Sequence, residues 1–149
     1  MNMPTRQIRS MRPAAINRVR ELEAAALALP QVAICTHHVL HAGVYARTIC
    51  IPAGVALTGA EIKLATLLII HGRVRVGTDD DEPIELDGYN VIPASAGRKQ
   101  AFLALTDTHL TMIFPTRAIT VAQAEDEFTD EAARLFSRIG ANTIQITGE

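Results

Sequence analysis

The chain has 149 residues, of which 48% are hydrophobic, 20% are charged and none is Trp. This length fits one domain, and the composition excludes a mostly disordered chain, so we expect a core of aliphatic side chains. The formal net charge of −2 argues against binding to nucleic acid or to an anionic membrane through bulk charge. Cys35 and Cys50 form neither a disulfide framework nor a zinc knuckle. We expect them to be buried free thiols, and the protein to be cytoplasmic with no membrane partner.

The N-terminal region divides into an arm and a helix. Residues 1–12 are expected to form an extended arm, and residues 13–30 a helix that begins at Pro13 and ends before Pro30. Its apolar residues recur at steps of three and four: Ile16, Val19, Leu22, Ala26 and Leu29. This stripe predicts a buried helix face, which either the domain or a second subunit covers.

The central region, residues 31–118, changes to short β-branched segments separated by turn residues. Strands are expected at residues 44–51, 64–70, 73–76, 84–86, 89–92, 100–105 and 108–114. About eight short strands at this spacing indicate a sandwich or barrel rather than a parallel α/β sheet. Residues 79–82 are acidic but lack the alternating ligands and the glycine of a calcium loop, which indicates a solvated hairpin tip.

The C-terminal region, residues 119–149, is expected to contain a helix from about residue 125 to residue 139, stopped by Gly140. The β-prone tail at residues 142–147 is expected to add an edge strand, either in its own sheet or across to a partner chain. The whole chain is therefore predicted to be a mostly-β single domain with a helix near each end.

Two segments resemble the motifs of the cupin superfamily. Residues 51–59, Ile-Pro-Ala-Gly-Val-Ala-Leu-Thr-Gly, resemble the start of the first cupin motif. Residues 88–93, followed by Gly97-Arg-Lys-Gln, resemble the second. Residues 44–59 are also similar to small cupin-like proteins encoded by bacteriophages and prophages. The resemblance covers about residues 40–115 and implies a cupin-like jelly-roll barrel, but one fold hosts many functions.

The same resemblance implies that the metal ligands of a cupin are lost. The positions of the two histidines, the glutamate and the last histidine of the motifs are taken here by Ala60, Ile62, Thr66 or Leu67, and Gln100. A divalent transition metal needs imidazole or carboxylate ligands. We therefore expect a metal-free protein without a cofactor.

Four residues are candidates for binding a ligand. Tyr45 and Arg47 share one strand face, which either lies inside the barrel, where it binds an anionic or sugar-like ligand, or forms part of a dimer seam. Gln100 stands at the second-motif position. His109 lies on one face of the last strand, and is either a ligand-binding or general-base histidine in the cavity or an exposed residue. No nucleophile, base and acid occur together, so no catalytic residue is assigned.

Other polar residues have less specific interpretations. Adjacent strand residues point to opposite faces, which disfavours His37 and His38 as joint metal ligands with His41. Lys63, Arg98, Lys99 and Arg117 are interpreted as solvated turn cations rather than residues of a cavity mouth. The Arg-rich N-terminal arm either is solvated or docks on an acidic protein; nucleic acid is disfavoured because no aromatic residues are interleaved for base stacking.

These observations favour a non-catalytic, metal-free structural or interaction module that forms a homodimer or a larger homo-oligomer. The phage resemblance implies a virion-associated role, such as capsid cementing or decoration, or a phage accessory role, with the arm contacting a larger viral assembly. The alternatives are a small-molecule-binding cupin and a metal-independent isomerase or lyase that uses His109 or Tyr45.

The interior of the barrel separates these three hypotheses. A barrel plugged by Ile62, Leu67 and Met112 favours the structural module. An open polar cavity with Tyr45, Arg47 and Gln100 favours ligand binding. A histidine hydrogen-bonded to a carboxylate inside the cavity favours catalysis.

Overall fold

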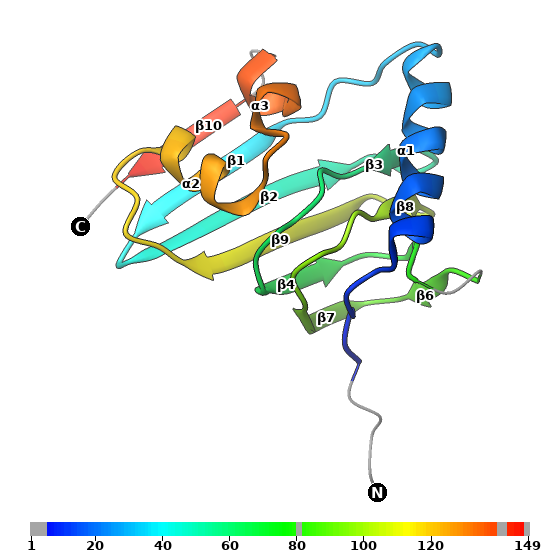
Figure 1. Ribbon diagram of the computed structural model, residues 1–149, viewed down its shortest axis with the longest axis horizontal. Helices are drawn as coiled ribbons and strands as arrows, with labels where there is room; N and C mark the ends of the chain where they lie inside the picture. Colours follow the sequence, from blue (N-terminus) through cyan, green and yellow to red (C-terminus); the bar gives the residue numbers. More distant parts are fainter. Residues whose placement is uncertain (1–5, 80–81, 140–142, 148–149) are drawn as a thin grey trace, which may run out of the picture.

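A computed structural model describes residues 6–79, 82–139 and 143–147 of the chain (Figure 1). Its ten strands form a six-stranded sheet in the order β10-β1-β2-β9-β4-β7 and a four-stranded sheet in the order β3-β8-β5-β6. The strands are β1 (Thr36–His41), β2 (Val44–Ile51), β3 (Ala56–Thr58), β4 (Thr66–His71), β5 (Val74–Val76), β6 (Ile84–Leu86), β7 (Tyr89–Ala94), β8 (Ala101–Ala104), β9 (Thr108–Pro115) and β10 (Thr143–Thr147).

The strand order defines a jelly roll. From β2 to β9 the chain passes repeatedly between the two sheets, so that β2-β9-β4-β7 stands in one sheet and β3-β8-β5-β6 in the other. This is the eight-stranded double-sheet arrangement of jelly rolls, and β1 and β10 only extend the larger sheet. The predicted mostly-β jelly-roll fold is confirmed, and the structure gives β2 the bounds expected from its sequence.

Period-two alternation places the core between the sheets. Tyr45, Ile51, Ile70 and Val74 are fully buried, whereas their strand neighbours face outward. Burying a large aliphatic or aromatic side chain contributes about 1.5–3 kcal/mol before entropy is counted. The jelly roll therefore derives its stability from an aliphatic core, as the low aromatic content of 4% predicts.

The described part of the N-terminal arm, residues 6–12, is bound to its own domain. The Ile8 amide donates to the Pro93 carbonyl at 2.9 Å, and the Ser95 amide donates to the Ile8 carbonyl at 2.8 Å. The Ile8 side chain is buried in the core. The arm adds to the open edge of β7, where unpaired backbone groups would otherwise face water.

Helix α1 (Pro13–Leu27) begins at Pro13, as predicted, but only half of its apolar stripe is buried within the chain. Ile16 and Val19 pack on the body, whereas Leu22 and Leu29 keep 49% and 65% of their surface exposed. The expectation of full burial is therefore met by the first half of the stripe alone. In Figure 1, the second half of the helix extends beyond the small sheet.

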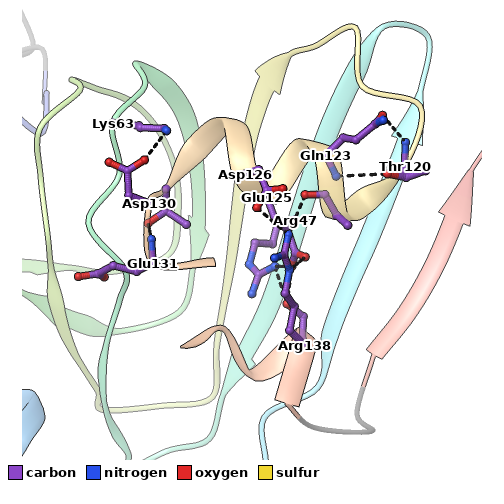
Figure 2. Close-up of polar contacts among 12 residues, drawn as sticks. Arg47, Lys63, Thr120, Gln123, Glu125, Asp126, Asp130, Glu131 and Arg138 are labelled. Carbon is purple, nitrogen blue, oxygen red and sulfur yellow. Dashed lines mark hydrogen bonds and ion pairs between the residues drawn. The ribbon is translucent and has the colours of Figure 1, made fainter. Parts of the chain in front are cut away.

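The C-terminal region contains a broken helix rather than the expected single helix over residues 125–139. Helix α2 (Val121–Phe128) starts earlier, because Thr120 and Gln123 form a reciprocal cap (Figure 2). The buried Thr129 is extended and ends α2, and a 3-10 turn (Ala132–Arg134) and α3 (Phe136–Ile139) follow. This break turns the chain so that Glu131 reaches the buried Lys99.

The C-terminal tail forms β10, which pairs in parallel with β1 of the same chain, with Thr36 opposite Thr143. The described part of the predicted edge strand is thus accommodated without a partner chain, and Asn142 lies outside the described residues. Among those residues, no helix has both the length and the hydropathy needed to cross a membrane.

Candidate ligand-binding cavity

A cavity of about 770 Å³ lies between the two sheets. Its wall comes from inward-facing positions of β2, β4, β8 and β9 and from the segments that follow α1 and α2. Most of the lining is apolar: Ile49, Val55, Leu57, Ile62, Leu68, Phe102, Leu110, Met112, Phe128 and Leu135. The lining residues Leu27, Leu29 and Val32 are exposed and mark the mouth of the cavity at the end of α1.

Arg98 is a buried cation in the wall of the cavity. The residue is 1% exposed, and its Nη1 donates to the carbonyl oxygens of Leu64 at 3.2 Å and Ser95 at 2.8 Å. Its Nη2 donates to Thr66 Oγ1 at 2.7 Å and lies 3.9 Å from the sulfur of Met112. Its Nε has no hydrogen-bond partner within the described structure. Burial lowers the pKa of Arg98 to about 10, so the guanidinium stays charged at neutral pH.

Lys99, the next residue, is also fully buried, but it is neutralised. Its Nζ lies 3.1 Å from Glu131 Oε2 and 3.0 Å from Glu23 Oε2, and donates to the Gly59 carbonyl at 2.9 Å. Arg20 of α1 also contacts Glu131. Burial raises the pKa of Glu131, but hydrogen bonds from the Glu61 amide, Arg20 and Lys99 outweigh it and lower the pKa to about 2. This cluster fastens α1 and the segment after α2 to the jelly roll.

Arg47 lines the cavity from β2 and is also neutralised. Its Nη1 donates to Glu125 Oε2 of α2 at 3.0 Å, and its guanidinium lies 5.6 Å from the centre of the Phe128 ring. Figure 2 shows Arg138 of α3 approaching the same carboxylate, which it meets at 3.0 Å. Glu125 is buried at 2% exposure, so two cations surround one buried acid and fix α2 and α3 over β2.

Tyr45 and His38 form a buried pair next to Arg47. The Tyr45 hydroxyl and His38 Nδ1 share a hydrogen bond of 2.6 Å, while His38 Nε2 is unpartnered among the described residues. Burial and the nearby charge of Arg47 lower the pKa of His38 to about 4. Burial also raises the pKa of Tyr45 to about 12. Both side chains are therefore neutral at pH 7, and neither lines the cavity.

The four predicted ligand-binding residues do not all meet. Arg47 and Gln100 line the cavity, and Gln100 Nε2 donates weakly to the Gly77 carbonyl at 3.4 Å. Tyr45 lies behind the wall with 0% exposure. His109 is exposed on the opposite face of the six-stranded sheet, where it lies across from His71 of the neighbouring strand. Of the two alternatives for His109, a cavity histidine or an exposed residue, the second agrees with this position.

The residues at the motif positions of a cupin metal site do not all meet either. Ala60, Ile62 and Gln100 line the cavity, Thr66 binds Arg98, and Leu67 is 41% exposed on the outer face. Within the described residues, no three His, Cys, Asp or Glu side chains are grouped so that they could hold a metal ion. Cys35 and Cys50 are free and half-buried.

Sequence reasoning missed the burial of Arg98 and Lys99, which were expected to be solvated. Lys63 and Arg117 are exposed, as predicted, and Lys63 pairs with the exposed Asp130 (Figure 2). The one available signal was the resemblance to the second cupin motif, which marked Gln100, two positions after Arg98, as a candidate ligand-binding residue. Strand alternation could not have shown that two adjacent residues are both buried.

Comparisons with known proteins show likeness of fold only. No family model and no curated protein sequence matches the chain. A conserved protein of unknown function from Streptococcus pyogenes aligns over 60% of this chain and 79% of its own, with 13% identity and a TM-score of 0.45. An RmlC-like cupin family protein with a double-stranded β-helix fold from Methanocaldococcus jannaschii aligns over 56% and 81%, with 16% identity and a TM-score of 0.47.

A cupin superfamily protein from Desulfitobacterium hafniense aligns over 76% of this chain and 99% of its own, with 16% identity and a TM-score of 0.46. At such values the likeness says nothing about chemistry. The strand order and the interior cavity define the class of the protein, which is a double-sheet jelly roll with an internal cavity.

Proposed function

We propose that the chain is a small-molecule-binding jelly roll whose interior cavity takes an organic ligand. The observation that carries this proposal is the cavity of about 770 Å³. Pockets for small molecules typically measure roughly 300–1,000 Å³ and combine an apolar lining with a few placed polar groups. The apolar wall together with Arg47, Arg98 and Gln100 fits that description.

The same geometry weighs against the two rival functions. Ile62 and Met112 line the cavity without filling it, and Leu67 lies on the outer face, so the barrel is not plugged. The partner of the buried His38 is a tyrosine rather than a carboxylate, and His109 is outside the cavity. Ligand binding is therefore better supported than a purely structural role or catalysis.

Binding of Nile red, a neutral dye whose fluorescence rises in apolar surroundings, tests this function. Ala60 lines the cavity, so Ala60→Phe should fill part of it and weaken dye binding at least tenfold. Ala53→Phe, at an exposed turn, is the matched control and should bind as the wild type does. Equal binding by both folded variants, or no binding by the wild type, would contradict the proposal.

A second candidate function, self-association, is favoured by the outer face of the six-stranded sheet. Its exposed and half-buried apolar residues are contiguous: Leu67 and Ile69 of β4 lie beside Pro93 and Val91 of β7, and Leu67 lies beside Ile113 of β9. We call this the outer patch. None of the outward-facing positions of β1, β2, β4, β7 and β9 carries Asp, Glu, Lys or Arg.

A face without charge suits contact with a second copy of itself, since two-fold pairing brings identical residues close to one another. We therefore propose a homodimer through the outer patch. A role in a phage virion, such as capsid decoration, rests on the resemblance of residues 44–59. Arg12 forms an ion pair with Asp79, and Arg6 donates to the backbone carbonyl of Glu85, which makes the arm a weaker candidate for docking on an acidic assembly.

A further inference from the structure

Arg98 differs from Arg47 and Lys99, the other cations at the interior, in having no acidic partner among the described residues. Arg47 lies 3.0 Å from Glu125, and Lys99 lies 3.1 Å from Glu131. The acceptors of Arg98 are two carbonyl oxygens, one hydroxyl and one thioether sulfur, all uncharged. A cation removed from water without a counter-charge is costly, and a bound anion would remove that cost.

The other ionisable groups in the cavity wall are already matched. Arg47 is paired with Glu125, while Glu131 is paired with Lys99 and Arg20, and Glu23 is paired with Lys99. The remaining lining cation, Arg134, lies 4.0 Å from Glu23 and is 75% exposed, where water solvates it. Arg98 is therefore the cation of the described cavity wall that a ligand would have to balance, and a single charge suffices.

The guanidinium also has donor capacity to offer. Its Nε is unpartnered, and one contact of Nη2 is to the Met112 sulfur at 3.9 Å, a weak acceptor on a flexible side chain. A small movement of Met112, which lines the cavity, would let ligand oxygens accept from Nε and Nη2 together. This edge of a guanidinium matches the two oxygens of a carboxylate.

We propose that the ligand is a monocarboxylic acid with an apolar body, and that Arg98 is its counter-charge. The single unmatched cation selects one negative charge, and the side chains of Leu57, Phe102 and Leu110 surround the apolar body. Gln100, which also lines the cavity, supplies a second polar group for the ligand. This inference rests on the proposed ligand-binding function.

Calorimetric titration with octanoate and with its neutral analogue octanamide tests the inference. We expect the wild type to bind octanoate at least tenfold more tightly than octanamide. Arg98→Gln should abolish that preference while it still binds octanamide. Arg75→Gln, which removes an exposed arginine of β5, is the matched control and should keep the preference.

The outcomes separate this inference from the proposed function. Equal binding of the two ligands by the wild type, or a preference that survives in Arg98→Gln, overturns the carboxylate assignment and leaves the cavity function standing. If neither octanamide nor Nile red binds the wild type, the cavity function itself fails. If Arg98→Gln does not fold, Arg98→Lys serves in its place, because lysine keeps the charge but lacks the two parallel donors of the guanidinium. Arg98→Lys should keep only part of the preference for octanoate over octanamide. A preference as large as that of the wild type would contradict a two-point contact between Arg98 and the carboxylate.

Discussion

Arg98 Nη2 donates to Thr66 Oγ1 at 2.7 Å in the interior of the jelly roll. The resemblance to cupins places a metal-binding glutamate at Thr66 or Leu67, and here a neutral hydroxyl at that position accepts a hydrogen bond from a cation. A divalent metal at this site would face a guanidinium at close range instead of a carboxylate. The electrostatic character of the interior is therefore the reverse of that in a metal site.

From this reversal we predict that the purified protein carries no stoichiometric Zn, Fe, Mn or Ni. Ala60 and Ile62 offer no lone pair, and the charge of Arg98 repels a metal ion. Elemental analysis of protein prepared without chelator measures the metal content, and added Zn²⁺ should leave the melting temperature unchanged. One equivalent of metal, with a melting temperature that falls on chelation, would contradict the prediction.

We predict that protonation of His38 destabilises the fold. Its pKa is about 4 in the folded chain against 6.5 normally, so below pH 6.5 the unfolded chain binds a proton that the folded chain excludes. The stabilising contribution is complete above pH 6.5 and is lost as the pH falls toward 4. This shift corresponds to a loss of about 2 kcal/mol between pH 7 and pH 5.

Urea unfolding at pH 7 and pH 5 measures this loss. His38→Asn, whose amide can replace Nδ1 toward Tyr45, should show a much flatter pH dependence over this range. His37→Asn, at an exposed position of the same strand, is the control and should behave as the wild type does. A steep pH dependence that persists in His38→Asn would place the responsible group elsewhere.

Lys99 should contribute much more stability than Lys63. Lys99→Met leaves the carboxylates of Glu131 and Glu23, 16% and 22% exposed, without their shared cation, and should cost about 3 kcal/mol. Lys63→Met removes a pair whose Asp130 is 86% exposed, and should cost less than about 1 kcal/mol. Chemical denaturation of both variants compares them directly, and similar losses would contradict the role of the buried cluster.

The contrast between these lysines shows where sequence reasoning ends. The jelly roll was predictable because alternation and turn residues act over short distances, as in β2 and in the turn at Gly88. Nothing local distinguishes Lys63 from Lys99. The burial of Lys99 depends on Glu23 and Glu131, which lie far away in the sequence and reach it only after the chain has folded.

The break between α2 and α3 could not be predicted for the same reason, because it depends on contacts between residues that are distant in the sequence. Residues 121–139 have the composition of one helix, but the extended Thr129 interrupts it, and Glu131 contacts Lys99 and Arg20 instead of continuing α2. Of the candidate ligand residues, Gln100 was found through the motif resemblance and Arg47 through strand alternation. Arg98 was missed because an unpaired buried arginine violates the rule that charges stay in water.

Substitutions in helix α1 test whether only the first half of its apolar stripe is buried. Val19 is 8% exposed and Leu22 is 49% exposed on the same apolar stripe. Val19→Asp should destabilise the fold by about 3 kcal/mol, because it buries an unpaired charge, whereas Leu22→Asp should cost about 1 kcal/mol or less. Thermal melting of the two variants checks this order, and a Leu22→Asp effect as large as that of Val19→Asp would indicate that a second subunit covers the helix end.

The outer patch should hold two copies of the chain together. A homodimer of the 16.1 kDa chain should give twice that mass by light scattering at micromolar concentration. Val91 of β7 is a 52% exposed member of the patch, so Val91→Lys would place a charge from each copy within the apolar interface and should yield a folded monomer. Ile119 is 81% exposed outside the strands, and Ile119→Lys is the matched control that should remain dimeric. The proposed interface is wrong if the wild type is a monomer at this concentration or if Val91→Lys keeps the dimer mass, because exposed apolar side chains on this face would then have another role or none.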